Sequence, residues 1–186
     1  MPPKVKVTKE EIVRAGLDVV RREGVEGLNA RQIAAELGCS TQPIFSNYQS
    51  MEDLRRAVLT AAAEICDNYS IKEIAAGNYP SYKASGMGYI RFAQEEKNLF
   101  RLLYMRNRGN QEENFETRRF DQMGDLVQDY VGLECDRARI FHLEMWIFVH
   151  GIAVMMATGY LELDMELVSQ ILSDAYWGIK QRFEKE

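Results

Sequence analysis

Apolar residues recur at helical spacing along almost the whole chain, and this pattern constrains the fold more than any other feature. Only four prolines interrupt it. Side chains three and four positions apart form one apolar stripe on a helix, and such a stripe is buried against another element. Because 46% of the residues are hydrophobic, the chain can also build a sizeable core. The sequence therefore predicts an all-α fold of about nine helices, without internal repeats or low-complexity tracts.

Capping residues and glycines set the expected helix boundaries. Three helices are expected to start where a capping residue is followed three positions later by a polar partner: Thr8 with Glu11, Asn29 with Gln32, and Ser50 with Asp53. Two glycines and a glycine-proline region end them: Gly24, Gly38 and Gly77–Pro80. Further helices are expected over residues 81–95, 98–107, 111–131, 137–160 and 164–183, with Asn110 and Asp164 as caps.

The composition favours a cytoplasmic protein without a membrane segment. Its three cysteines are too scattered for a disulfide framework or a zinc site. No apolar stretch at the N-terminus suits a signal peptide. The most apolar window, Met145–Ala157, is 13 residues long, short of the roughly 20 that a spanning helix needs. It is expected to be a buried helix.

The net charge of −5 is unevenly distributed along the chain. Residues 1–59 carry nine Lys or Arg against eight Asp or Glu, whereas the remaining residues carry the acidic excess. A surface that binds an anion, such as nucleic acid, is therefore expected in the first third of the chain.

Residues 38–48, GCSTQPIFSNY, follow a short expected helix and a glycine turn, and they predict a second short helix. Two short helices joined by a tight turn are typical of the helix-turn-helix motif, whose second helix can enter the DNA major groove. With Ser40 as the N-cap, Pro43 is the third residue of this helix, where its missing N–H has no intrahelical partner. The free N–H groups at such a helix start suit contacts with phosphates and base edges.

Residues 28–54, LNARQIAAELGCSTQPIFSNYQSMEDL, resemble the DNA-binding domain of the TetR family of transcriptional repressors. A second stretch, WIFVHG at residues 146–151, resembles the Trp, His and Gly signature of one TetR-type C-terminal domain. The resemblance implies a three-helix DNA-binding domain at residues 1–50. It also implies an effector-binding and dimerisation domain at residues 51–186.

The same resemblance implies which side chains bind double-stranded DNA. Asn29 and Arg31 are expected to hold backbone phosphates, and Ile44 is expected to pack inward. The remaining expected contacts with bases, sugars and nearby phosphates come from the second helix and its ends: Ser40, Thr41, Gln42, Pro43, Phe45, Ser46, Asn47 and Tyr48.

Two positions depart from the family pattern. Phe45 stands where the family commonly has a tyrosine that reaches a phosphate, and Met51 stands where it usually has a lysine. Phosphate contacts supply much of the affinity of a protein for DNA, so two anchors are missing. An N-terminal arm that carries Lys4, Lys6 and Lys9 is our hypothesis for their replacement.

Aromatic and Met residues recur at helical spacing in the middle of the chain, which fits either an ordinary core or a ligand cavity. Tyr and Met side chains suit a cavity better than a dense core of Leu and Ile does. The resemblance implies an effector cavity here, for a neutral hydrophobic compound or an anion. Its expected lining residues are Phe92, Phe100, Leu103, Tyr104, Phe120, Met123, Met145, Trp146 and Val149.

His142, Trp146 and His150 are predicted to share one helical face. At about 1.5 Å of rise per residue the two histidines lie about 12 Å apart, so they cannot hold one metal ion. A packed or hydrogen-bonded histidine is the expected role. No nucleophile motif accompanies them, and the sequence favours neither an enzyme nor a metal or other cofactor.

The last two expected helices carry apolar residues on two sides. One side covers the core of the domain, and the second requires another partner. A homodimer through a four-helix bundle provides that partner, with Gly151 and Gly159 permitting close approach. Two copies also place two recognition helices about 34 Å apart, the spacing of successive major grooves.

We interpret the chain as a homodimeric transcriptional repressor that binds a palindromic operator and is released by a small-molecule effector. Two alternatives stay open. One is a DNA-binding regulator without an effector. The other is a helical protein-interaction module that has lost DNA binding.

Overall fold

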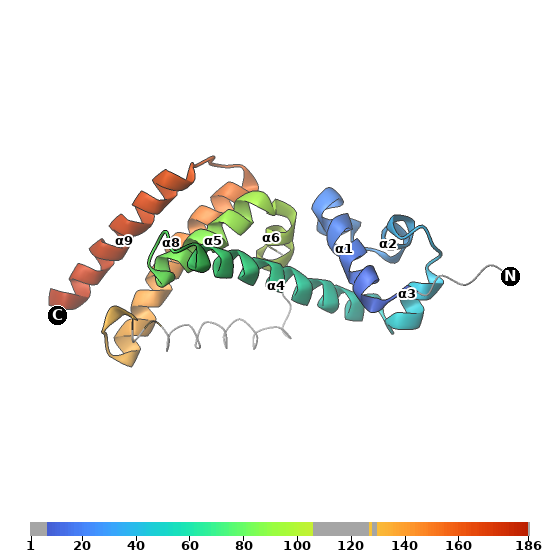
Figure 1. The fold of residues 1–186 in the computed structure, drawn as a ribbon, viewed down its shortest axis with the longest axis horizontal. Coiled ribbons are helices and arrows are strands. Elements are labelled where there is room, and N and C mark those ends of the chain that lie inside the picture. The colour runs from blue at the N-terminus through green and yellow to red at the C-terminus, as the bar shows by residue number, and fades with distance from the viewer. Residues whose placement is uncertain (1–6, 106–126, 128–129, 186) are drawn as a thin grey trace. The chain divides into compact units, whose positions relative to one another are not determined.

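The computed structural model describes residues 7–105, residue 127 and residues 130–185, and the regular structure in these ranges is helical (Figure 1). The elements are α1 (Lys9–Glu23), a 3₁₀ turn η1 (Val25–Gly27), α2 (Ala30–Glu36), α3 (Gln42–Asn47), α4 (Met51–Ala76), α5 (Ser81–Glu95), α6 (Lys97–Tyr104), α8 (Cys135–Thr158) and α9 (Met165–Lys185). The all-α prediction is confirmed. Most of the helix expected at residues 111–131, with its cap at Asn110, lies outside the described residues.

Most of the expected helix ends are confirmed by their caps. The Thr8 hydroxyl accepts the N–H of Glu11 at 3.2 Å, and the Glu11 carboxylate accepts the N–H of Thr8 at 2.8 Å. Asp164 accepts the N–H of Leu167 at 2.7 Å. The turn η1 was not expected; it follows Gly24, whose φ of 76° is one that residues with a Cβ rarely adopt.

The chain divides into two compact units. The first comprises Met1–Asp67 and Glu96–Arg106, and the second comprises Asn68–Glu95 and Asn107–Glu186. The predicted division at residue 50 concerns function rather than compactness, and it stays a prediction.

The first unit packs α1 against its neighbours through an aliphatic core. The residues of this core that are 0–3% exposed are Ile12, Val19, Val20, Leu28, Ile33, Ile44, Leu54, Val58, Ala62, Cys66, Leu99, Phe100 and Leu102. The α6 helix is fastened to α1 by polar contacts as well. The Arg21 guanidinium donates twice to the Glu96 carboxylate at 2.9 Å, and the Asn98 amide donates to the Arg21 carbonyl at 2.8 Å.

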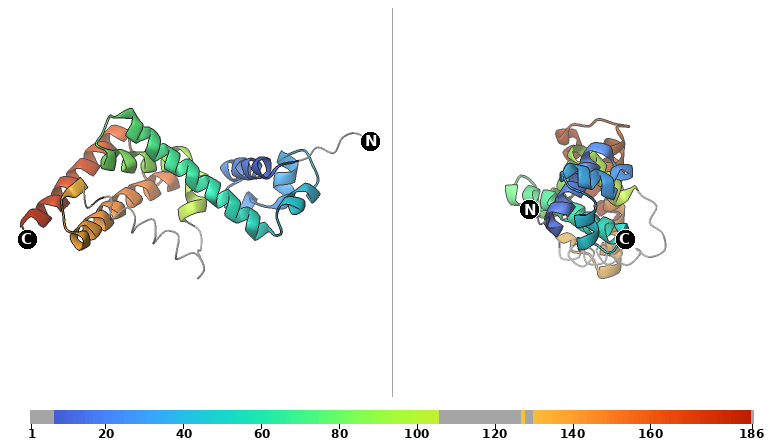
Figure 2. Two further views of the ribbon diagram at one scale, coloured as in Figure 1. Left: turned by 60° about the horizontal axis from the view of Figure 1, so that its bottom comes forward. Right: turned by 90° about the vertical axis from the view of Figure 1, so that its right-hand side faces the viewer.

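The second unit is built from α5, α8, α9 and the end of α4, and α5 lies along α8 (Figure 2). The α4 and α5 backbones approach closely at Gly88, where a Cβ atom would lie 2.6 Å from the Cα of Ser70. A larger residue at this position would therefore separate the two helices. A cluster of buried residues joins α8 and α9: Val127, Val131, Ala138, Phe141, Met145 and Phe183.

The α8 helix is more apolar than the sequence argument allowed. Among the described residues, its stretch Asp136–Thr158 has a mean hydropathy of 1.6 and is long enough, by length and composition alone, to cross a membrane. The 13-residue window therefore underestimated its apolar length. One side of the stretch nevertheless packs against α5 and α9 in the second unit, as a core helix does. Gly159 ends α8 with a φ of 74°, and its expected place at the interface of a dimer stays a prediction.

Candidate nucleic-acid interface

A tight turn joins α2 to α3 and gives the first unit its helix-turn-helix motif. Gly38 has a φ of 63°, the left-handed conformation that commonly ends a helix. The N–H groups of Gly38 and Cys39 donate to the carbonyls of Ala35 and Ala34 at 3.1 and 2.9 Å. These bonds satisfy carbonyls at the end of α2 and fix the direction in which the chain leaves it.

The predicted start of α3 is wrong by one residue. Thr41, not Ser40, is the N-cap, because the Thr41 carbonyl accepts the N–H of Phe45 at 3.3 Å. Thr41 already has helical dihedrals, and its side chain makes no capping bond. Pro43 is consequently the second residue of the helix, where its missing N–H again has no intrahelical partner.

One face of α3 is anchored in the core and the opposite face is exposed. Ile44 is fully buried, whereas Phe45 is 51% exposed. Gln42 and Ser46 are also exposed, and the Ser46 hydroxyl donates to the Gln42 carbonyl at 2.9 Å. The inward orientation expected for Ile44 is confirmed, and the exposed polar side chains are the ones that the prediction assigns to DNA.

Asn47 and Tyr48 make contacts within the protein that the sequence did not reveal. The Asn47 amide donates to the carbonyls of Val7 and Pro43, at 3.2 and 2.8 Å. The ammonium of Lys9 lies 5.6 Å from the centre of the Tyr48 ring, within the range of a cation–π contact. The end of α3 therefore holds the segment that leads into α1.

Asn29 and Arg31 lie at the start of α2, as expected. The Asn29 side-chain oxygen accepts the N–H groups of Arg31 and Gln32, both at 3.1 Å, and its amide donates to the Gly27 carbonyl. Asn29 thus caps α2, while the exposed Arg31 side chain is the stronger candidate for a phosphate contact.

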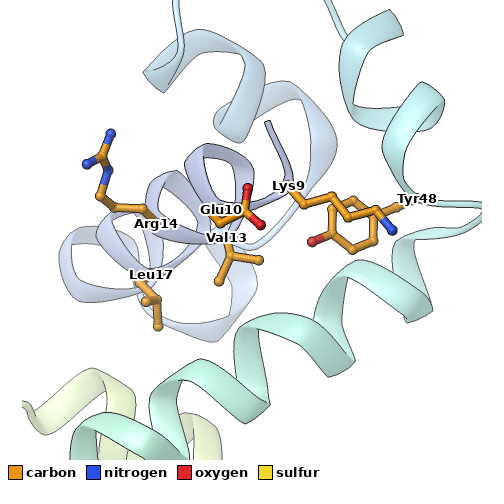
Figure 3. A pocket seen from close by; sticks show the side chains of 6 residues that line it. All are labelled: Lys9, Glu10, Val13, Arg14, Leu17 and Tyr48. Atoms are coloured by element: carbon orange, nitrogen blue, oxygen red, sulfur yellow. The ribbon is translucent and has the colours of Figure 1, made fainter. Parts of the chain in front are cut away.

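A cavity of about 320 Å³ beside α1 is lined by Lys9, Glu10, Val13, Arg14, Leu17 and Tyr48 (Figure 3). Burial raises the pKa of the Tyr48 hydroxyl, and the negative charge of Glu10 raises it further. The hydroxyl therefore stays protonated at neutral pH. A second cavity of about 370 Å³ is lined by Tyr69, Lys72, Glu73, Ala76, Asn78, Tyr79, Arg91 and Glu95.

Neither of these two cavities is lined by a predicted effector residue. Phe120 and Met123 lie outside the described residues. Three others belong to α6 in the first unit: Phe100, Leu103 and Tyr104. The remaining four belong to the second unit: Phe92, Met145, Trp146 and Val149. Phe92 and Phe100 are fully buried, and Met145 is part of the core cluster. The assignment of these nine residues to a cavity stays a prediction.

Two tyrosine–histidine pairs connect α5 to α8. The Tyr82 hydroxyl lies 3.0 Å from Nδ1 of His142, and the Tyr89 hydroxyl lies 2.9 Å from Nδ1 of His150. Tyr82 precedes Tyr89 in α5, and their partners His142 and His150 follow in the same order in α8. The two helices therefore run parallel. The expectation of hydrogen-bonded histidines is confirmed. Tyr82 was missed, although its seven-residue spacing from Tyr89 places both on one helical face.

The environments of the two pairs differ. Tyr82 is surrounded by the rings of Tyr130, Phe141 and Tyr176 at centroid distances of 5.5 to 6.4 Å. Burial raises the pKa of Tyr82 and lowers that of His142, so both groups are neutral at neutral pH. His150 is half-buried and stacks on Trp146, with ring centres 4.7 Å apart.

This arrangement defines a helix-turn-helix unit and a separate helical unit, and comparison with known proteins agrees with it. Residues 82–175 match the Tetracyclin repressor-like, C-terminal domain. The chain is 24% identical over 163 residues to an uncharacterised helix-turn-helix-type transcriptional regulator of Mycobacterium tuberculosis, covering 84% of this chain and 73% of that protein.

Solved structures share the fold. A TetR-like transcriptional regulator from Rhodococcus sp. RHA1 superimposes with a TM-score of 0.70 at 15% identity, covering 95% of this chain and 96% of the other. A protein of unknown function from the same organism gives a TM-score of 0.67 at 22% identity, covering 95% and 97%.

The chain therefore belongs to the TetR family of transcriptional regulators. It is a helix-turn-helix regulator and not an enzyme, and membership of this family implies that it binds DNA.

Proposed function

We propose that the protein is a homodimeric repressor that recognises a palindromic operator with α3 and leaves it when a small-molecule effector binds in the second unit. The observation that carries this proposal is the two-sided character of α3. Fully buried Ile44 holds the helix from within, and exposed Gln42 and Ser46 face outward. Ser40, Thr41 and Pro43 complete the start of this recognition helix, where N–H groups favour anions.

Exposed apolar residues on α8 and α9 support the dimer. The residues concerned are 38–58% exposed: Ile140, Leu143, Trp146, Ile147, Phe148, Leu167 and Trp177. Outside the backbone of α8 itself and the two neighbouring residues, no atom of the described part of the chain lies within 4 Å of the position that a Cβ of Gly151 would occupy, so α8 offers room for a close neighbour at that point. A two-fold axis through this surface buries its apolar residues against the same surface of the second copy.

The tyrosine–histidine pairs support the proposal that an effector binds in the second unit. Neutral hydroxyl and imidazole groups within an aromatic environment offer both donors and acceptors to a ligand that inserts among them. A hundredfold loss of operator affinity on effector binding corresponds to about 2.7 kcal/mol of coupling between the two sites.

Selection from random duplexes tests the proposal. The purified protein is expected to enrich a palindrome whose half-sites lie one or more helical turns apart. Gln42→Ala is expected to relax the preference at one base position by roughly 1–3 kcal/mol, whereas Arg31→Ala weakens binding to all sequences and flattens the salt dependence. Enrichment of no sequence by a dimeric protein would favour the protein-interaction module instead.

A ligand screen then separates the repressor from a regulator without an effector. Compounds that raise the unfolding temperature are tested for release of the selected operator. Release by at least one of them supports the proposal. An operator affinity unchanged by every stabilising compound contradicts the effector.

A further inference from the structure

The side-chain amide of Asn47 joins two parts of the chain that lie forty residues apart. It donates to the Val7 carbonyl at 3.2 Å and to the Pro43 carbonyl, one turn earlier in α3, at 2.8 Å. An amide nitrogen carries two hydrogens, so both donors of this side chain are used inside the protein. The reverse orientation would place the amide oxygen against two carbonyl oxygens.

We propose that Asn47 is a positioning residue that holds the segment ahead of α1 beside α3, rather than a residue that contacts phosphate. The inference depends on the proposed role of α3 as the recognition helix. Only an acceptor oxygen remains on the Asn47 side chain, and phosphate oxygens are acceptors as well. While the two bonds exist, Asn47 contributes no phosphate contact.

A second contact fixes the same segment. Lys9 places its ammonium over the ring of Tyr48, the residue that follows Asn47. Val7 itself is 7% exposed, whereas Thr8 and Lys9 are exposed. The backbone from Val7 to Lys9 is therefore held at its start by Asn47 and at its end by Tyr48, both at the C-terminal end of α3.

Basic residues flank the anchored residue Val7 in the sequence. Lys6 directly precedes Val7, and Lys4 is three residues from it, which a chain extends by at most roughly 11 Å. Lys4 and Lys6 lie outside the described residues, and together with Lys9 they give this end of the chain three positive charges. They supply the phosphate contacts that Phe45 and Met51 do not make.

A double-mutant cycle tests the inference on the operator that the wild-type protein selects. Asn47→Leu keeps the approximate shape of the side chain and removes both donors. A second protein carries Lys4→Ala, Lys6→Ala and Lys9→Ala. Each is expected to lower operator affinity about tenfold, and the combination about tenfold rather than a hundredfold, because both remove the same contacts.

The salt dependence provides a readout that a loss of fold would not change in the same way. In the dimer the triple lysine variant removes six charges and is expected to reduce the slope of log affinity against log salt by about 5, and Asn47→Leu by a similar amount. Arg31→Ala serves as the matched control. Its effect is expected to multiply with that of the lysine variant, because Arg31 lies at the start of α2, away from the Asn47 contacts.

Multiplicative effects of Asn47→Leu and the lysine variant would overturn the inference, as would an unchanged salt slope for Asn47→Leu. Circular dichroism establishes that each variant is folded, and Asn47→Ala replaces the leucine variant in the cycle if that one does not fold. If the wild-type protein selects no palindrome, the proposed function itself fails. If it does and the cycle is multiplicative, only the role of Asn47 fails.

Discussion

The two compact units differ in the side chains that build their cores. In the first unit the core is mainly aliphatic, and charged pairs such as Arg21 with Glu96 lie towards the surface. In the second unit the core is rich in aromatic rings and encloses neutral polar pairs, of which Tyr82 with His142 is the most buried. A dense aliphatic core favours a rigid helix-turn-helix unit. Neutral buried pairs can exchange hydrogen-bond partners with a ligand.

The largest expected effect tests the aliphatic core of the first unit. Ile44→Ala removes a fully buried side chain from α3 and is expected to lower the free energy of unfolding by about 2–5 kcal/mol. Phe45→Ala is the matched control, because its ring is 51% exposed and its loss is expected to cost much less. Urea unfolding followed by circular dichroism measures both; equal losses would show that α3 is not anchored by Ile44.

A smaller effect tests the helix packing of the second unit. Gly88→Ala places a Cβ 2.6 Å from the Ser70 Cα, so the α4 and α5 backbones must move. Despite the better helix propensity of Ala, we expect a loss of about 1–3 kcal/mol in the free energy of unfolding. Gly86→Ala is the control, since its Cβ meets the Val149 side chain at 3.2 Å. If Gly86→Ala lowered the free energy of unfolding more than Gly88→Ala, the result would contradict the close approach of α4 and α5 at Gly88.

Helix starts could be predicted from the sequence because a cap and its partner are three residues apart. The Thr8 capping box, the Asn29 cap and the Asp164 cap were found in this way, and α5 has the expected bounds. The N-cap of α3 was misplaced because Ser40 and Thr41 are both good capping residues, and only the backbone bond from Phe45 to Thr41 distinguishes them.

Contacts between distant residues could not be predicted in the same way. The bond between Asn47 and Val7 spans forty residues, and no periodic pattern connects them. Helical spacing also identifies which face of α5 is buried, but it does not tell whether a buried ring such as Phe92 borders a cavity or fills the core. The helix-turn-helix motif was therefore easier to predict than a ligand cavity.

Removal of one hydroxyl tests the buried polar pair of the second unit. Tyr82→Phe removes the hydrogen bond to Nδ1 of His142 in a buried position, and we expect a loss of about 1–3 kcal/mol in the free energy of unfolding. Tyr89→Phe is the matched control: its partner His150 is half-buried, so water can replace the hydroxyl at lower cost. Equal losses in the two variants would mean that burial does not distinguish the pairs.

The smallest effect concerns the pH dependence of the same pair. Burial lowers the pKa of His142 from 6.5, so in mild acid the unfolded chain binds a proton that the folded chain does not. The stability is therefore complete above about pH 6.5 and falls as the pH drops below it, by at most about 1.4 kcal/mol per pH unit. His142→Asn keeps an acceptor for Tyr82 and does not titrate. Unfolding free energies at pH 7.5 and 5.5 are expected to differ more for the wild type than for this variant. Both proteins keep His150 and every carboxylate, so their other acid-sensitive groups are the same. An equal loss of unfolding free energy at pH 5.5 in the two proteins would therefore show that His142 is not held neutral by its buried pair.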